Sequence, residues 1–345
     1  MKLINTTEAE GHVLCHDLTR IVPGEYKGPA FRKGHVVTKE DIPVLLKMGK
    51  EHLYVWEMND DMLHEDEAAQ ILCDISMGDT DLMTHGSPKE GKIEIFASAD
   101  GLLKIDRDKL NSINSLGEMM IATVHGDFPV KKGEKLAGTR IIPLAISKEK
   151  MEKARKAAGN CPILKILPVK KVRYGIITTG SEVYKGLIED KFGPVLKAKM
   201  EEYDAEFIEQ IILPDDKERI TDAIRMLAFE KDCDVVLVSG GMSVDPDDNT
   251  PGAIKDTGAD VIVYGAPVLP GAMFLLAYLD ADGRSVPVMG LPGCIMFAGR
   301  TVFDLVLPRV LAGERLAADD ITGYGEGGLC LNCTVCHFPN CGFGK

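Results

Sequence analysis

Four short segments in the second half of the chain combine glycine, hydroxyl and carboxylate residues in a pattern typical of an oxyanion-binding site. They are Thr179-Gly180-Ser181-Glu182, Pro214-Asp215-Asp216, Ser239-Gly240-Gly241-Met242-Ser243 with Asp245-Pro246-Asp247-Asp248-Asn249-Thr250 behind it, and Gly290-Leu291-Pro292-Gly293. Glycines let the backbone approach a ligand closely, and peptide N–H groups donate hydrogen bonds to phosphate oxygens. We therefore expect these segments to bind a small molecule that carries a phosphate.

The two glycine-rich segments each follow a short apolar run that is rich in β-branched residues. Residues 172–177 and 235–238 are typical of strands buried on both faces of a sheet, and helical patterns follow both loops. In an open α/β sheet, ligands bind beyond the carboxyl ends of parallel strands. The two loops are thus predicted to leave the same edge of one sheet.

Strand and helix patterns alternate from about residue 172 to 313, as they do in βαβ units. The expected fold class is α/β, a three-layer α/β/α domain with a mostly parallel sheet, accompanied by smaller β-rich modules at the N-terminus and in the middle. Five segments are predicted: an N-terminal α+β segment, a β-rich module with a helical lead-in, a linker helix, the α/β domain, and a glycine-rich hinge with a cysteine-rich tail. Their bounds are 1–58, 59–146, 147–171, 172–313 and 314–345.

The charge balance limits the classes of partner. The 345 residues include 40 basic and 53 acidic side chains, for a net charge of −13. A repulsive long-range field argues against binding to nucleic acid or to an anionic membrane. The sequence shows neither a secretory leader nor an apolar run of roughly 20 residues, so we expect a cytoplasmic protein.

Four of the nine cysteines crowd the last residues of the chain. Cys330, Cys333, Cys336 and Cys341 are separated by two, two and four residues, which is a spacing typical of a metal site. Thiolate ligands suit either Zn²⁺ or an iron–sulfur cluster, and the spacing resembles a ferredoxin run with a longer last gap. The other five cysteines are interpreted as buried thiols of a reducing compartment.

Taken together, the four segments and their strand–helix rhythm resemble the molybdopterin-binding domain of molybdenum cofactor biosynthesis. The form is that of molybdopterin molybdotransferases and the gephyrin E domain, and the resemblance covers residues 172–313. It implies that the chain binds molybdopterin or the molybdenum cofactor, with molybdate as a further ligand and a molybdoenzyme as an acceptor. Relatives commonly place the site at a dimer interface, so the resemblance also implies a homodimer.

The resemblance also assigns roles to residues. Glu182, Asp215 and Asp248 match the functional acids of the family, and we expect them to hold Mg²⁺ against an oxyanion. Asp216, Asp245 and Asp247 are neighbours in the same loops, and Asp215 has the alternative role of a helix N-cap. The remaining matched positions are expected to bind the cofactor: Thr179, Gly180, Ser181, Ser239, Gly240, Gly241, Ser243, Thr250, Pro292 and Gly293.

Three departures from the family pattern stand out. The serine-methionine-aspartate-glycine-tyrosine motif is missing, the C-terminal β module is replaced by the cysteine tail, and residues 268–273 carry no cation where relatives carry lysines. A basic loop at 27–35 offers Arg32 and Lys33 as substitutes, because an arginine fork suits a phosphate. The alternative is that this loop is simply solvated.

The sequence leaves three functions open. The first is an enzyme, a molybdopterin molybdotransferase-like protein that inserts molybdate with the help of Mg²⁺. The second is a carrier or ligand-responsive regulator that binds the cofactor without turnover. The third is a nucleotide pyrophosphatase of the competence-damage type, which the missing deamidase-like domain disfavours.

Overall fold

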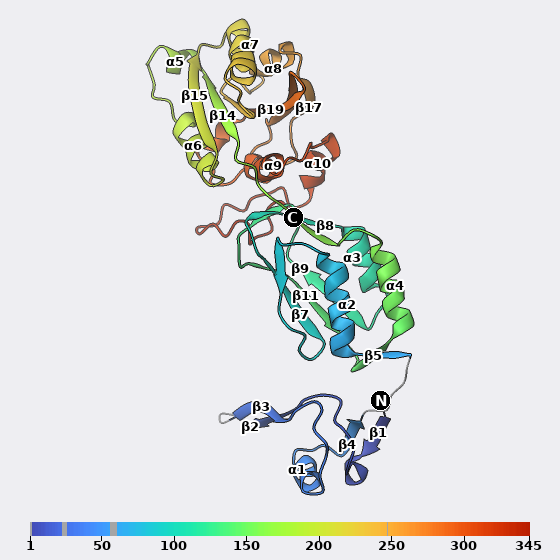
Figure 1. The fold of residues 1–345 in the computed structure, drawn as a ribbon. Helices are drawn as coiled ribbons and strands as arrows, with labels where there is room; N and C mark the ends of the chain where they lie inside the picture. Colours follow the sequence, from blue (N-terminus) through green and yellow to red (C-terminus); the bar gives the residue numbers. More distant parts are fainter. Residues whose placement is uncertain (1, 23–25, 56–60, 247) are drawn as a thin grey trace. The chain divides into compact units, whose positions relative to one another are not determined.

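A computed structural model describes residues 2–22, 26–55, 61–246 and 248–345, with side chains left out at 21–22 and 26–27 (Figure 1). Asp247, which the sequence places beside the site, lies outside the described residues. Contacts divide the chain into two compact units, and each is described by itself. Unit 1 comprises residues 1–99, 104–124 and 131–166, and unit 2 comprises 100–103, 125–130 and 167–345.

Unit 2 is built on a six-stranded sheet with the order β15-β14-β16-β19-β18-β17. The first four strands in this order are parallel, whereas β18 is antiparallel to both β19 and β17. The strands are β14 (Arg173–Thr179), β15 (Glu206–Leu213), β16 (Val235–Ser239), β17 (Asp260–Tyr264), β18 (Leu275–Ala281) and β19 (Arg284–Leu291). Every residue of β16 is buried, as expected of a parallel strand covered on both faces.

Helices cover both faces of this sheet (Figure 1). One face packs against α7 (Lys217–Arg225), the π-helical turn η2 (Met226–Glu230) and α8 (Thr250–Asp256). The other packs against α6 (Phe192–Glu201), α9 (Val302–Leu311) and α10 (Ala318–Thr322). The short elements are α5 (Ser181–Tyr184), η3 (Gly293–Met296) and η4 (Gly323–Gly325). The predicted three-layer α/β/α class is confirmed.

The start of α7 corrects one detail of the sequence prediction. Asp216, not Asp215, is the N-cap, and its carboxylate accepts a hydrogen bond from the Arg219 amide at 3.0 Å. Asp215 turns the other way and accepts from Ser181 instead. Its carboxylate is thus available to the site-forming loops rather than consumed by a helix end.

A buried charged cluster fixes the start of α9. Asp304 forms a capping box with Thr301 and accepts hydrogen bonds from Lys199 at 2.6 Å and from Arg300 at 2.9 Å. The side chains of Lys199 and Asp304 are nearly inaccessible to solvent. Their attraction offsets the cost of burying each charge only while both partners are present.

Unit 1 contains an antiparallel sheet with the order β6-β7-β11-β9 and three helices, of which α2 packs on β7 and β11. These elements are β6 (Met83–His85), β7 (Lys92–Ala97), β9 (Met119–Thr123), β11 (Lys135–Ile141), α2 (Glu65–Met77), α3 (Arg107–Asn114) and α4 (Lys148–Ala158). The β-rich middle module expected from the sequence forms this sheet. Helix α3 follows a weak apolar pattern, and the sequence analysis does not predict it.

The rest of unit 1 consists of short paired strands and one helix. Strand β1 pairs with β4, β2 with β3, and β5 with β12, all antiparallel. Their bounds, with those of the helices between them, are β1 (Lys2–Asn5), η1 (Thr6–Glu8), β2 (Leu18–Val22), β3 (Tyr26–Phe31), α1 (Asp41–Lys47), β4 (His52–Val55), β5 (Met62–His64) and β12 (Ala145–Ser147). The remaining strands are β8 (Gly101–Ile105), β10 (Phe128–Val130) and β13 (Leu164–Leu167), of which β10 and the first three residues of β8 belong to unit 2. In the described ranges, no helix combines the length and apolar character needed to cross a membrane.

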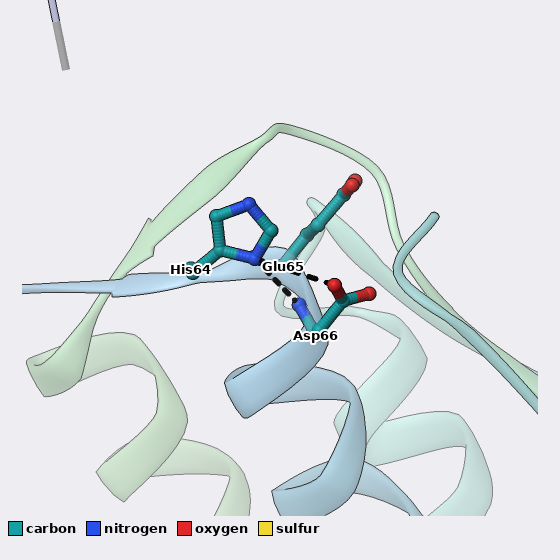
Figure 2. Close-up of side chains that lie close together, drawn as sticks. All are labelled: His64, Glu65 and Asp66. Atoms are coloured by element: carbon teal, nitrogen blue, oxygen red, sulfur yellow. Dashed lines mark hydrogen bonds and ion pairs between the residues drawn. The ribbon is translucent and has the colours of Figure 1, made fainter. Parts of the chain in front are cut away.

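Helix α2 begins with three titratable side chains in a row, His64, Glu65 and Asp66 (Figure 2). The Nε2 of His64 lies 2.8 Å from the carbonyl oxygen of Cys15, which can only accept, so Nε2 carries the proton. Nδ1 then accepts from the Asp66 amide at 3.2 Å and from the Lys33 ammonium at 2.9 Å. The histidine therefore serves as an N-cap whose lone pair is already used.

Glu65 is buried beside this cap. Burial, helped by the nearby charges of Asp66 and Glu90, raises the pKa of its carboxyl to about 7, against the opposing effect of Lys33 and Arg140. The folded state thus binds a proton between pH 4.5, the ordinary pKa, and about 7 that the unfolded state has lost. The stability that the neutral carboxyl contributes is fully present below the ordinary pKa of 4.5. It is lost as the pH rises through the folded-state pKa of about 7.

We expect Glu65→Gln to abolish this loss. Its free energy of unfolding should exceed that of the natural chain at pH 8 by on the order of 2 kcal/mol, and the two should converge near pH 5. Chemical denaturation followed by circular dichroism at both pH values measures this. Glu152→Gln, an exposed carboxylate on α4, should behave like the natural chain. An equal response of both variants to pH would contradict the assignment.

Asp304→Asn should destabilise unit 2 by about 3 kcal/mol, because it leaves the buried Lys199 ammonium without its carboxylate. The same denaturation measurement tests this against Asp319→Asn, an exposed acid in the first turn of α10. A loss no larger than that of the control would show that the buried charges are not a stabilising unit.

Candidate functional site

The carboxyl ends of β14 and β16 lie side by side, and their loops leave the sheet together. The two strands pair in parallel, with Thr178 opposite Ser239. A Cβ on Gly240 would stand 2.2 Å from the carbonyl oxygen of Thr179, and Gly240 and Gly241 have φ values of +89° and +56°. Only glycine fits this combination of close approach and left-handed backbone. The glycine pair is therefore required by the contact between the two loops.

Thr250, at the start of α8, joins the two loops from behind. Its buried hydroxyl donates to the carbonyl oxygen of Gly240 at 2.9 Å and lies 3.4 Å from the hydroxyl of Thr179. Its amide donates to the carbonyl oxygen of Gly241 at 3.2 Å. These bonds fix the backbone of the second loop in one conformation.

Asp215 binds the first loop. Its Oδ2 accepts from the amide of Ser181 at 2.9 Å and from the Ser181 hydroxyl at 3.2 Å. The donors that the sequence assigns to a phosphate at Ser181 are thus already used by a carboxylate of the chain itself. Glu182 is exposed beside this loop, with Oε2 3.5 Å from where a Cβ on Gly180 would stand.

Asp248 binds the second loop in the same manner. Its Oδ2 accepts from the amide of Ser243 at 2.7 Å. The hydroxyl of Tyr264 donates to the carbonyl oxygen of Met242 at 3.0 Å, and burial raises the pKa of this phenol, with the charge of Asp248 adding to the effect. The second loop is thus held by bonds at Met242 and Ser243.

A cleft of about 520 Å³ opens at this edge of the sheet. Its walls are the second glycine loop with Asp248, the loop that precedes β18, and the start of η3. The lining residues are Gly240, Gly241, Met242, Ser243, Asp248, Leu269, Pro270, Gly271, Ala272, Met273, Pro292, Gly293 and Cys294. Among these described residues there is one carboxylate and no basic side chain. The amides of Gly240, Gly241 and Met242 have no acceptor within the described part of the chain.

The structure sorts the predicted site residues of unit 2 into two groups. Those that line the cleft are Gly240, Gly241, Ser243, Asp248, Pro292 and Gly293. Those that support the loops without lining it are Thr179, Gly180, Ser181, Glu182, Asp215, Ser239 and Thr250. Sequence reasoning did not assign Met242, Cys294 or the 269–273 loop to the site, although the Pro270-Gly271 pair was noted for lacking a cation.

The two predicted cations belong to unit 1. Arg32 is exposed, and Lys33 donates to Asp66 at 3.0 Å and to His64 at 2.9 Å. Lys33 therefore has an acidic partner in its own unit, and its contact with a ligand stays a prediction.

Two places offer metal-binding side chains. The group at His64, Glu65 and Asp66 brings its ligand atoms within 4.8 Å, but the histidine lone pair is used as described above. The four tail cysteines, Cys330, Cys333, Cys336 and Cys341, are free thiols that line a second cavity of about 460 Å³ in unit 2.

Known proteins resemble two parts of the chain. A family described as "Probable molybdopterin binding domain" matches residues 175–312, and a domain of unknown function (DUF8806) matches residues 3–57. The molybdopterin molybdenumtransferase of Haemophilus influenzae is 25% identical over 197 residues. That match covers 54% of this chain and 45% of the relative, so the chain spans less than half the length of this curated relative.

Solved structures of related name align with part of the chain. The tungsten cofactor synthesizing protein MoaB from Pyrococcus furiosus is 24% identical, with 36% of this chain and 84% of that chain covered and a TM-score of 0.32. The molybdopterin biosynthesis enzyme MoaB from Thermus thermophilus is 18% identical, with 41% and 98% covered and a TM-score of 0.33. The family match confirms the expectation from the sequence. Residues 175–312 of this chain thus match the molybdopterin-binding domain of molybdenum cofactor biosynthesis.

Proposed function

We propose that unit 2 binds molybdopterin, or its metal-loaded form, in the cleft beside Gly240 and Gly241. The observation that carries this proposal is the row of backbone amides at Gly240, Gly241 and Met242, which line the cleft and have no acceptor in the described residues. Such a row suits a terminal phosphate, because several N–H dipoles converge on one oxyanion. Met242 and the loop at 269–273 supply the apolar walls that a pterin ring needs.

The electrostatics of the cleft favour a divalent cation as a second ligand. Among the described residues that line the cleft, Asp248 is the one with a charged side chain. Without a cation, this carboxylate would repel an anionic cofactor. Oδ2 of Asp248 is held by the Ser243 amide, which leaves Oδ1 for a metal. Carboxylate oxygen is the ligand that Mg²⁺ prefers, so the residues present fit this ion.

We further propose that the site supports insertion of molybdate. Mg²⁺ supplies neutralisation of negative charge when it is bound there. The chain itself positions the reacting groups. In this proposal the amides of Gly240 to Met242 hold the phosphate, Asp248 holds the cation, and Thr250 keeps the loop rigid. Asp215 and Glu182 stand next to the first loop, where Asp215 orients Ser181 rather than facing the cleft.

The first expected outcome concerns binding. Gly293→Leu should lower the affinity for molybdopterin by at least roughly tenfold, because the new side chain would occupy the cleft. Gly293 lines the cleft, and a Cβ there would meet nothing within 4 Å, so the protein itself is not strained. Isothermal titration or fluorescence titration of the full chain with molybdopterin under anoxic conditions gives the dissociation constants.

The matched control is Gly323→Leu in η4, which is exposed, meets nothing within 4 Å and lies outside the lining of the cleft. It should bind like the natural chain. Arg32→Ala belongs in the same series, where a weaker affinity would support a contribution from the basic loop. Equal affinities of the natural chain and Gly293→Leu would remove the cleft from the proposal.

The second expected outcome concerns turnover. Asp248→Asn should lower Mg²⁺-dependent formation of molybdenum cofactor by roughly a hundredfold while binding of molybdopterin without Mg²⁺ is retained or strengthened. The amide oxygen of asparagine still accepts from Ser243, so the loop keeps its shape. Asp245→Asn, an exposed acid in the same loop, is the control. If the natural chain binds molybdopterin but forms no cofactor from molybdate and Mg²⁺, the carrier function replaces the enzymatic one.

A further inference from the structure

The cysteine tail is folded onto unit 2 and fixed at both ends. At its start, Leu329 forms a parallel bridge with Leu269, and the Cys330 amide donates to the carbonyl oxygen of Leu269 at 2.8 Å. At its end, the Gly344 amide donates to the carbonyl oxygen of Gly327 at 2.9 Å, and Phe343 lies in the main core of the unit. The glycine-rich segment, expected to be a hinge, is a packed turn in this structure: Tyr324 is buried, and a Cβ on Gly328 would clash with the carbonyl oxygens of Pro267 and Tyr324.

Between these anchors, the tail encloses the cavity of about 460 Å³. All four tail cysteines line it, and the other walls are mostly apolar. They consist of Phe297, Ala298, Gly299, Arg300, Leu329, Leu331, Asn332, His337, Phe338, Gly342 and Phe343. No carboxylate is among these described residues. The guanidinium of Arg300 is paired with Glu202 and Asp304 and lies 5.1 Å from the centre of the Phe338 ring.

The spread of the thiols distinguishes between the metal centres that four cysteines can hold. A tetrahedral zinc ion with Zn–S bonds of about 2.3 Å brings its sulfurs to within about 3.8 Å of one another. Throughout the described tail, no three of the cysteine sulfurs lie within even 4.8 Å of one another. They surround a cavity rather than a point, as ligands of a polynuclear centre do.

We propose that Cys330, Cys333, Cys336 and Cys341 bind one iron–sulfur cluster of the [4Fe–4S] type. The first three ligands have the two-residue spacing of bacterial cluster-binding runs, and the fourth returns to the same cavity after the turn at 338–340. Arg300 lines the same cavity, but Glu202 and Asp304 already balance its charge, so it is not counted as a counterion of the cluster. The apolar side chains of Phe338 and Phe343 would pack against the cluster, while the exposed Cys333 and Cys336 leave one side of it open to solvent.

This centre is independent of the proposed function, since it rests on the tail alone. Its position is nevertheless informative. A third cavity, of about 430 Å³, shares Leu329 and Cys330 with the tail cavity and Leu269, Pro270 and Cys294 with the ligand cleft. The cluster would therefore lie at one end of a groove in unit 2 whose other end is the cleft.

The test uses the full chain expressed with added iron and purified without oxygen. We expect about four iron atoms and four acid-labile sulfides per chain, visible absorption that bleaches on reduction, and an electron paramagnetic resonance signal in the reduced state. Cys333→Ala and Cys336→Ala should lose most of the iron. Both residues are exposed, so their replacement leaves the core intact, which thermal denaturation by circular dichroism verifies. Cys161, which the sequence analysis interprets as a buried thiol, is exposed in unit 1, and Cys161→Ala should keep the full iron content.

The outcomes separate clearly. Iron and sulfide that depend on Cys333 and Cys336 but not on Cys161 support the cluster. About one zinc per chain with little iron would overturn it, and so would a natural chain that takes up no iron during anoxic reconstitution with iron and sulfide. Equal iron in the natural chain and in both tail variants would also overturn it, because the metal would then lie elsewhere.

Discussion

The contact between Gly240 and the Thr179 carbonyl is the constraint on which the site of unit 2 depends. At this point two parallel strands end so close together that a Cβ on residue 240 would stand 2.2 Å from that oxygen. Because the strand ends are fixed, the glycine loop must turn away with positive φ, and its amides have no acceptor in the described residues. Thr250 then secures the turn from below with two hydrogen bonds. The cleft is therefore a consequence of strand packing, and it is already formed without a ligand.

The acids of the site first serve the fold. Asp215 accepts from the amide and hydroxyl of Ser181, and Asp248 accepts from the amide of Ser243. These carboxylates take up the donors at the flanks, whereas the amides of Gly240 to Met242 have no acceptor in the described residues. The arrangement explains why the two glycine loops, similar in sequence, differ in role. The first is closed by its own chain, and the second is open to the cleft.

Much of unit 2 could be predicted from the sequence, because its strands are short, apolar and β-branched and its helices have clear periodicity. The start of the last long helix is less clear from the apolar pattern: Met296 ends a separate short turn, and the helix begins at Val302 after the Thr301 cap. Asp215 and Asp216 are harder to separate, because both precede a helix and only the backbone decides which one caps it. The walls at 269–273 come from a loop distant in sequence, and no local pattern reveals which cavity such a loop will line. The spacing of the tail cysteines predicts a metal site, but nothing in it predicts that the tail packs.

The segment at Leu269 and Pro270 has two roles that are physically inseparable. It forms one wall of the ligand cleft, and its backbone carries the parallel bridge and the hydrogen bonds that anchor the start of the tail at Gly328 and Cys330. Gly271, directly after it, is pressed against Val302 at the start of α9, where a Cβ would lie 2.6 Å from the Val302 side chain. The 269–271 backbone is thus packed too tightly against α9 to move independently of it. The backbone at Leu269 therefore joins the start of the tail directly to the wall of the cleft.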